Sequence, residues 1–442
     1  MVTSVAAMHS QQPAPPRATS ANERRLGPGL ITGAADDDPS GIATYSQAGA
    51  QFGFSMLWTT VLTYPLMAGI QRVSALLGYI TGRGLAANIG AAFPRPVLLG
   101  IVALLLIANT FNIAADVAAM GQALRLLLGG SAQVYAITFG LLCLVLQVFL
   151  RYATYVRYLR WLTLALLSYV AVVFTISVPW GEVLRALLRP RLPFTHDTIL
   201  IVVAVFGTTI SPYLFFWQAA AEMEDRRSAA NGSSAAAAGA QDSSPPPLGA
   251  ATRSHLRRIR WDTYVGMAFS NLVAFFIILS TAATLHAAGI THIQTSAQAA
   301  EALRPLGGPL TFLLFSCGII GTGMLAVPVL AGSAAYAVTE TFQWRSGLDL
   351  KLGEGRKFYG LIALATVGGA ALGFTPFDPI RALLWSAVIN GVIAVPIMAV
   401  MMRLATNPVI MGPYVIRRRL RVLGWLATTV MAGAVVAMLA TL

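Results

Sequence analysis

The stretch Gly33-Ala34-Ala35-Asp36-Asp37-Asp38-Pro39-Ser40-Gly41 interrupts an apolar segment that runs from residue 26 to 51. An ionisable side chain at membrane depth costs about 2.5–3.5 kcal/mol on insertion scales, so it indicates a functional site. Pro39 removes a backbone donor, and the flanking glycines loosen a helix. Unwound backbone inside a bilayer is tolerated only where it is buried in protein or lines a cavity. The stretch therefore predicts a broken helix that presents carboxylate and carbonyl oxygens to a cation.

The composition is typical of an all-α membrane protein. The chain has 442 residues, 56% of them hydrophobic and only 11% charged, whereas a soluble domain has about 25% charged residues. Apolar runs of about 20 residues, the length that crosses a bilayer, recur along the chain. We expect eleven transmembrane helices, at residues 26–51, 54–79, 97–125, 133–150, 158–178, 198–224, 261–286, 308–336, 358–375, 378–402 and 421–441.

The net charge of +13 would suit a nucleic-acid partner, but the positions of the charges argue against one. If the N-terminus is cytoplasmic and the sides alternate, most of the 30 Lys and Arg residues fall on cytoplasmic segments. The opposite side then carries only Arg125, Arg185, Arg189, Arg191, Arg304 and Arg381. This positive-inside asymmetry predicts a multi-pass protein of the inner (cytoplasmic) membrane with an extracytoplasmic C-terminus. Its surroundings are then the lipid bilayer, with no nucleic acid.

A second interruption lies in the sixth span, at Gly207-Thr208-Thr209-Ile210-Ser211-Pro212. Interrupted spans at matching positions of two halves indicate a transporter binding site, and an odd number of spans per half makes the second copy inverted. We therefore expect a first five-helix repeat at 26–178 and a second at 198–402. The remaining parts are a disordered tail (1–25), an outer loop (179–197), a flexible linker (228–250), and a basic loop with a peripheral helix (403–442).

Other polar residues within the spans are candidates for an ion or proton pathway. Asn109, Asn112 and Asp116 share one face of the third span, and interhelical hydrogen bonding is the plain explanation for the asparagines. Asp116 is a lone carboxylate and could relay protons. Further candidates are Gln47, Asn390 and Glu222; the last belongs either to a cation-attracting patch or, as we favour, to a solvated helix end. Cys143 and Cys317 lie in apolar runs and are expected to be small hydrophobic residues.

The two interruptions also carry a resemblance to a known family. Asp38-Pro39-Ser40-Gly41 resembles the Asp-Pro-Gly-Asn motif of Nramp divalent-metal transporters, and Ile210-Ser211-Pro212-Tyr213 resembles their Met-Pro-His motif. The resemblance covers all eleven spans in order and spacing. It implies a LeuT-like fold in which helices 1 and 6 break at mid-membrane and hold a metal ion.

The resemblance also assigns site residues, with departures from the family pattern. It implies that Asp38 is a metal ligand, that Gly41 stands where the family has asparagine, and that Ser211 stands where it has methionine. Thr208 falls at the position that donates a carbonyl, and Tyr213 replaces a histidine linked to proton movement. The pattern resembles the Nramp-related magnesium transporters. Asp36 and Asp37 add charge nearby, although successive side chains point about 100° apart on a helix, so at most some of the three aspartates touch the ion.

The chemistry of these residues favours a hard cation. A thioether selects softer transition metals, whereas carboxylate, carbonyl and water suit Mg²⁺, Ca²⁺ and Mn²⁺. Mg²⁺ usually keeps several waters, and glycine at position 41 leaves space for them. The sequence thus predicts import of Mg²⁺, and also of Mn²⁺, as partly hydrated ions. Because Tyr213 replaces the proton-linked histidine, we expect uptake that is uncoupled from protons and driven by the membrane potential, which gives a dication about 4.6 kcal/mol per 100 mV.

Several alternatives remain open on the sequence. One is a conventional proton-coupled Mn²⁺/Fe²⁺ symporter, and another is an amino-acid-type transporter, whose substrate carboxylate Asp36–Asp38 would repel. A sensor that binds but does not transport the cation is a third. A membrane enzyme is disfavoured because all five histidines fall in tails or loops. We expect no cofactor apart from the substrate ion, Mg²⁺ or Mn²⁺, and we expect a monomer.

Overall fold

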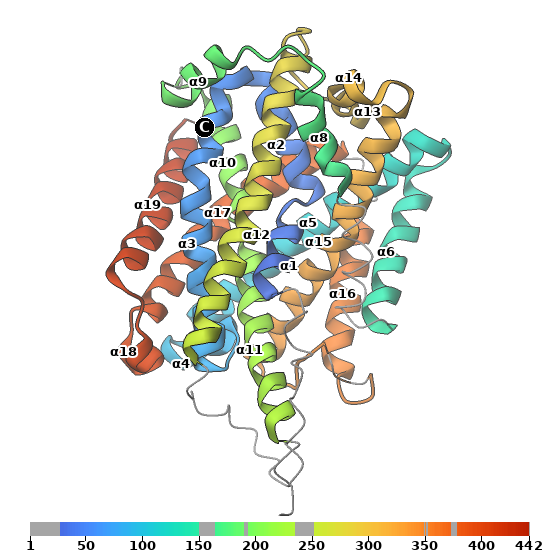
Figure 1. The fold of residues 1–442 in the computed structure, drawn as a ribbon. Helices are drawn as coiled ribbons and strands as arrows, with labels where there is room; N and C mark the ends of the chain where they lie inside the picture. The colour runs from blue at the N-terminus through green and yellow to red at the C-terminus, as the bar shows by residue number, and fades with distance from the viewer. Residues whose placement is uncertain are drawn as a thin grey trace, which may run out of the picture.

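The computed structural model describes residues 27–149, 164–189, 193–234, 252–348, 350, 352–372 and 378–441. Within these ranges the protein is a bundle of helices without strands (Figure 1). In chain order the helices are α1 (Pro28–Asp36), α2 (Pro39–Phe52), α3 (Leu57–Thr81), α4 (Leu85–Ala92), α5 (Arg95–Leu128), α6 (Ala132–Phe149), α8 (Leu167–Val173), α9 (Trp180–Leu188), α10 (His196–Thr209), α11 (Pro212–Ser234), α12 (Thr252–Thr281), α13 (Ser296–Ala300), α14 (Arg304–Gly307), α15 (Thr311–Thr341), α16 (Arg356–Leu372), α17 (Pro379–Ala405), α18 (Pro408–Met411) and α19 (Arg418–Ala440). Short 3₁₀ and π turns join several of them.

The first predicted span is broken where the sequence indicates. Helix α1 ends at Asp36, and α2 begins at Pro39 after an extended Asp38 with φ −69° and ψ 169°. A proline fits the first position of a helix because the N–H it lacks would have no partner there. The sixth span is broken in the same way, since α10 ends at Thr209 and α11 begins at Pro212.

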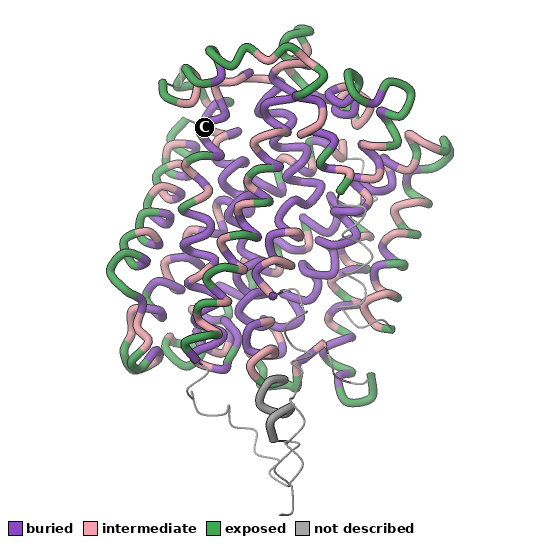
Figure 2. Tube along the Cα trace, viewed as in Figure 1, coloured by how far each residue is buried: buried purple, intermediate pink, exposed green. Residues whose placement is uncertain are grey.

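The broken helices pack backbone to backbone against their neighbours. A Cβ added at Gly33 of α1 would lie 2.3 Å from the carbonyl oxygen of Gly266 in α12. A Cβ at Gly207 of α10 would lie 2.1 Å from the carbonyl oxygen of Ala387 in α17. Such small residues let membrane helices approach closely. Both breaks are therefore held in the buried middle of the bundle (Figure 2).

Seven helical segments of the described ranges are long and apolar enough to cross a membrane. They are Arg95–Leu128, Ala132–Phe149, His196–Arg227, Thr252–His286, Ser296–Thr341, Pro379–Ala405 and Arg418–Ala440. The broken first span, α3 and α16 also match predicted spans but are shorter or less apolar, and the fifth span is described only from residue 164. The multi-pass, all-helical architecture is thus confirmed. The count of eleven and the repeat boundaries stay predictions.

Three expected boundaries differ from the structure. Helix α11 continues to Ser234 instead of giving way to a linker at residue 228, and α12 begins at Thr252 instead of 261. The outer loop expected at 179–197 contains α9. Hydropathy places only the apolar part of a helix, and these helices extend beyond it into polar sequence. The rest of the expected linker, the expected tail at 1–25 and residues 150–163 lie outside the described residues.

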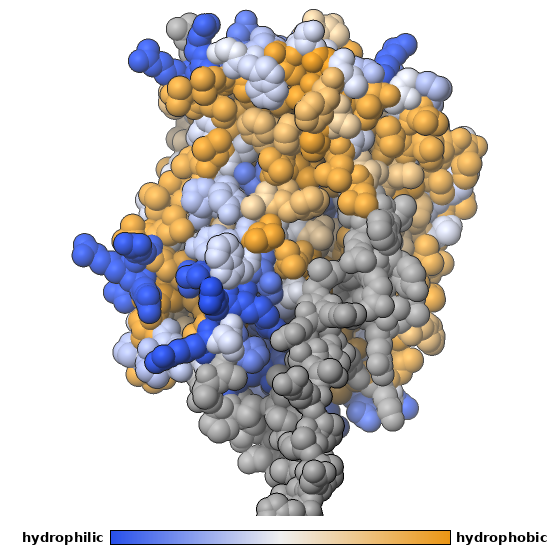
Figure 3. Space-filling model, in the orientation of Figure 1, coloured by the Kyte–Doolittle hydropathy of each residue, from blue (hydrophilic) through white to orange (hydrophobic). Residues whose placement is uncertain are grey.

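The surface agrees with a protein that spans a membrane. On the face shown in Figure 3, apolar side chains cover the middle, and hydrophilic ones gather at the top and at the lower left. The end of α19, labelled C, lies at the top of Figure 1, and the end of α11 lies at the bottom. The ends of α19 and α11 thus lie at opposite ends of the bundle. Which end faces the cytoplasm stays a prediction.

The glycine contact between α1 and α12 generates a stability prediction. Gly33→Ala should lower the free energy of unfolding by about 1–3 kcal/mol, because the added methyl overlaps the Gly266 backbone. Gly100→Ala in α5 is the control, because its Cβ would meet nothing within 4 Å. Thermal denaturation of the purified protein in detergent measures both. Equal melting temperatures for the two variants would contradict the close contact.

Candidate functional site

Asp38 lies at the centre of the first break and begins α2. Its Oδ1 accepts hydrogen bonds from the Gly41 backbone N–H and from the Ser40 hydroxyl, both at 2.7 Å. This is an N-cap, in which a side-chain oxygen satisfies an otherwise unpaired helix N–H. Asp38 is 1% exposed, and its Oδ2 has no hydrogen-bond partner among the described residues. One carboxylate oxygen is therefore left to bind something else.

Hydroxyl groups connect the two breaks. The Ser40 hydroxyl lies 3.4 Å from Thr208 Oγ1, and the Tyr45 hydroxyl lies 3.1 Å from Thr209 Oγ1. A Cβ added at Gly41 would lie 3.2 Å from Thr208 Oγ1 and 3.5 Å from Asp38 Oδ1. Gly41 thus lies between the Asp38 carboxylate and the last turn of α10. The structure brings Asp38, Gly41 and Thr208 together, as the sequence predicts.

Ser211 and Tyr213 complete the second break. The Ser211 hydroxyl is hydrogen-bonded to the carbonyl oxygens of Gly207 at 3.0 Å and Thr208 at 2.7 Å. The Tyr213 hydroxyl donates to the carbonyl oxygen of Ala35 at 3.0 Å and lies beside the Asp38 carboxylate. Both side chains therefore satisfy backbone carbonyls that a helix break leaves without a partner. The Thr208 carbonyl, which the family resemblance makes a metal ligand, accepts the Ser211 hydroxyl in this arrangement.

Asp36 and Asp37 turn towards α12 instead of joining Asp38. The Ser270 hydroxyl of α12 lies within hydrogen-bond distance of Asp36 Oδ2 and, at 3.0 Å, of Asp37 Oδ1. Among the described residues no three His, Cys, Asp or Glu side chains form a cluster that could hold a metal. The three aspartates thus face at least two directions, and Asp38 is the one that faces α10. Asp36 Oδ1 also has no hydrogen-bond partner in this part of the chain.

The polar residues of α5 divide into structural and unpaired ones. Asn109 Nδ2 donates to the Leu330 carbonyl and the Ser333 hydroxyl of α15, and Asn112 Nδ2 donates to Asn390 Oδ1 of α17 at 3.0 Å. The interhelical role expected of the asparagines is confirmed. Asp116 differs, because it is fully buried and both of its carboxylate oxygens lack a hydrogen-bond partner among the described residues. It interacts electrostatically with Asp38.

Two predicted pathway residues lie away from the breaks. Gln47 accepts from the Ile293 N–H at 2.9 Å and donates to the Thr291 carbonyl at 3.1 Å, so it holds the segment that precedes α13. Glu222 of α11 is 0% exposed and pairs with Arg258 of α12 at 3.4 Å. The solvated helix end that we favour for Glu222 is therefore wrong, because α12 continues beyond its apolar part and brings Arg258 against α11.

Sequence reasoning missed the roles of Ser270, Tyr45 and Thr209. Ser270 contacts two of the three aspartates, and the Tyr45–Thr209 pair joins α2 to α10. Single hydroxyl residues in an apolar span are common and carry little signal. Their partners lie far apart in the sequence, so only the fold reveals the contact.

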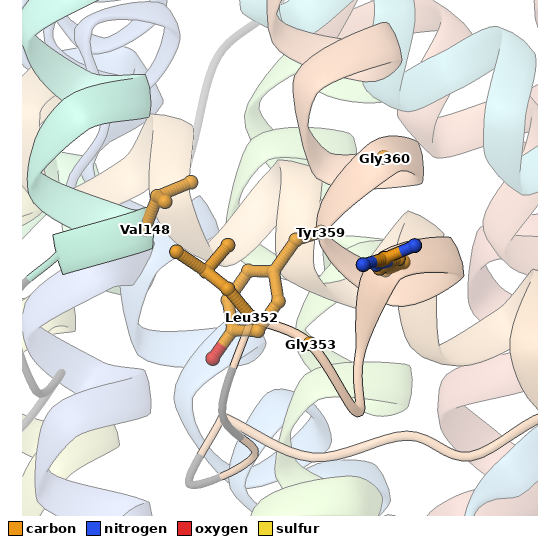
Figure 4. Close-up of a pocket in the computed structure, with 6 residues that line it drawn as sticks. Val148, Leu352, Gly353, Tyr359 and Gly360 are labelled. Carbon is orange, nitrogen blue, oxygen red and sulfur yellow. The ribbon is translucent and has the colours of Figure 1, made fainter.

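A surface pocket elsewhere on the molecule does not serve this site. It has a volume of about 430 Å³ and lies between α6 and α16 (Figure 4). Its lining residues are Val148, Leu352, Gly353, Arg356, Tyr359 and Gly360. None of these is a carboxylate, and none belongs to either helix break. The pocket therefore offers no carboxylate to a cation.

The arrangement at the breaks suits a cation. A buried carboxylate oxygen without a partner is costly, and a bound cation would compensate its charge. Such oxygens occur on Asp36, Asp38 and Asp116, all in the buried interior. The Ser40 hydroxyl contacts Asp38, and the Thr208 hydroxyl lies next to that of Ser40. A hard or borderline dication prefers oxygen donors of this kind.

Comparisons with known proteins agree with this reading of the fold. A family model described as natural resistance-associated macrophage protein-like (Nramp) matches residues 29–441. A protein named divalent metal cation transporter MntH from Mycobacterium tuberculosis is 26% identical over 413 residues, which cover 92% of this chain and 89% of that relative. A protein of the same name from Verminephrobacter eiseniae is 34% identical over 206 residues, which cover 43% of this chain and 44% of the relative.

Solved structures show the same fold at low sequence identity. A manganese transporter from Eremococcus coleocola superimposes with a TM-score of 0.68 and 18% identity, over 94% of this chain and 85% of that one. Mhp1, a nucleobase-cation-symport-1 family transporter in a closed conformation, gives a TM-score of 0.56 and 14% identity over 95% and 93%. The fold is thus shared with transporters of this architecture. Because the family model matches almost the whole length, the chain belongs to the Nramp family, a family of membrane transporters and not of enzymes.

Proposed function

We propose that this protein carries divalent metal cations across a membrane, with Asp38 as the central ligand. The observation that carries the proposal is the free Oδ2 of Asp38, which is buried where two broken helices meet. Family membership adds support, since the Mycobacterium tuberculosis relative is named a divalent metal cation transporter. Gly41, Thr208 and Ser211 line the same space. Asp36 and Asp37 contribute charge from the side of α12.

Mn²⁺ is the ion that the relatives support best. The Eremococcus coleocola protein is named a manganese transporter. The two MntH relatives are named for divalent metal cations in general. This ranks Mn²⁺ above the Mg²⁺ that the sequence alone favours. Mg²⁺ stays a second candidate for one reason. Ser211 supplies a hydroxyl where a thioether would discriminate against hard ions.

The properties of Asp116 favour metal transport that is coupled to protons. Its unpaired carboxylate interacts with the charge of Asp38, so metal binding at Asp38 changes how strongly Asp116 holds a proton. Tyr213 argues in the other direction, because its hydroxyl is engaged with the Ala35 carbonyl and is a poor proton carrier near neutral pH. We place coupled Mn²⁺ transport first. Uncoupled uptake driven by the membrane potential is the second candidate.

Neutralising Asp38 tests the central ligand. Asp38→Asn should lower metal affinity about 100-fold, because a carboxylate ligand is lost while the amide oxygen can still cap α2. Asp378→Asn is a matched control, because Asp378 likewise caps a helix, α17, and precedes a proline. Uptake of Mn²⁺ into proteoliposomes and titration calorimetry measure the effect. Unchanged uptake by Asp38→Asn would refute the proposal.

Ion selectivity is tested at Ser211. Millimolar Mg²⁺ should inhibit Mn²⁺ uptake by the wild type, because an oxygen-only site distinguishes these ions poorly. Ser211→Met should weaken that inhibition about tenfold by adding a thioether. Competition curves in proteoliposomes give both values. If Mg²⁺ fails to compete in the wild type, magnesium is excluded as a second substrate.

Coupling is tested with a pH-sensitive dye inside the vesicles. Inward Mn²⁺ flux should acidify the interior, and Asp116→Asn should abolish the acidification while Asp378→Asn keeps it. Asparagine matches aspartate in size, so the fold has little reason to change. Metal uptake by the wild type without acidification would contradict coupling and return uncoupled transport to first place.

A further inference from the structure

Three sulfur atoms lie in the buried interior close to Asp116. The Cys143 thiol of α6 donates a hydrogen bond to the Met324 thioether of α15, with a sulfur–sulfur distance of 3.5 Å. Cys143 is 0% exposed and Met324 is 4% exposed. A weak donor and a weak acceptor, contributed by two different helices, therefore meet away from water. The family resemblance does not account for this pair.

Met120 of α5 places a third sulfur against α15, at the residue before Met324. It is fully buried and lies one helical turn after Asp116 on α5, so the two side chains share a face of that helix. A Cβ added at Gly323, the residue before Met324, would lie 2.7 Å from the Met120 sulfur. The same point lies 3.2 Å from Cγ of Pro39. The Met120 sulfur thus lies beside Pro39, next to the helix break that holds Asp38.

Asp116 supplies the charge for this group. Both of its carboxylate oxygens are buried without a hydrogen-bond partner among the described residues. Its carboxylate interacts electrostatically with the Cys143 thiol and with Asp38. No described cation balances it, since the ion pairs that the structure shows involve other carboxylates. An uncompensated carboxylate beside a thiol and two thioethers has the donors of a metal site.

We propose that Asp116, Met120, Cys143 and Met324 form a second cation site, selective for soft or borderline dications such as Cd²⁺ and Zn²⁺. On binding, the Cys143 thiol and the Asp116 carboxyl group release their protons to the solution, and the metal takes their place. The thiolate and the Asp116 carboxylate together neutralise the dication, and the thioethers complete the coordination. The proposed soft-metal site thus lies next to the proposed transport site, whose ligands are oxygen atoms.

This inference is independent of whether Asp38 binds the transported ion. It predicts binding at a place that the oxygen-only ligands do not reach, and it is tested by spectroscopy instead of flux. A protein that fails to transport could still show the second site. Conversely, a transporter without it would leave the proposed function intact.

The experiment titrates the purified full-length protein with Cd²⁺ and records the ultraviolet charge-transfer band of a Cd²⁺–thiolate bond. The wild type should show a saturable band, and Cys143→Ser should remove it. Cys317→Ser is the matched control, because Cys317 is the second free cysteine and lies elsewhere on α15. This control should keep the full band, since its sulfur is not part of the group.

Two further variants separate a built site from a reactive thiol. Met324→Leu and Asp116→Asn keep Cys143 and should each lower the Cd²⁺ affinity about tenfold or more. Size-exclusion chromatography checks that each variant remains folded. The inference is overturned if the wild type shows no band, if Cys143→Ser retains it, or if both further variants bind Cd²⁺ as tightly as the wild type.

Discussion

The structure depends on satisfying the backbone where two helices stop inside a bilayer. Asp38 caps the start of α2, and Tyr213 donates to the Ala35 carbonyl at the end of α1. Ser211 does the same for two carbonyls at the end of α10. Tyr213 belongs to the second break but satisfies a carbonyl at the first, so the two breaks depend on each other. The two interruptions form one buried unit with few remaining polar groups.

The remaining polar groups explain why the unit is suited to ions. Capping uses one oxygen of Asp38 and leaves the other, and Asp116 has both oxygens free of hydrogen bonds among the described residues. Burial makes these charges costly, and the fold offers them no described counter-ion. These buried charges therefore lower the stability of the protein without a cation and raise its affinity for one. The glycine contacts that lock α1 and α10 into the bundle offset part of that cost.

The sequence revealed the breaks more readily than their surroundings. Proline and glycine next to Asp38 and Ser211 act through local backbone chemistry, so both interruptions were predictable. An interhelical hydrogen bond was likewise expected for Asn112. Ser270 and the sulfur group around Asp116 were not, because each joins residues on different helices that no local pattern connects. Glu222 was misread for a related reason. Hydropathy ends a helix where charges begin, whereas α12 continues and places Arg258 beside it.

The contacts of Gln47 give α2 a second role. The Gln47 amide nitrogen donates to the Thr291 carbonyl, and its amide oxygen accepts from the Ile293 N–H. Gln47 lies more than two turns after Asp38 on the helix that Asp38 begins. A helix is stiff along its length, so the Gln47 contacts tie the position of residues 291–293 to the orientation of the helix that Asp38 caps.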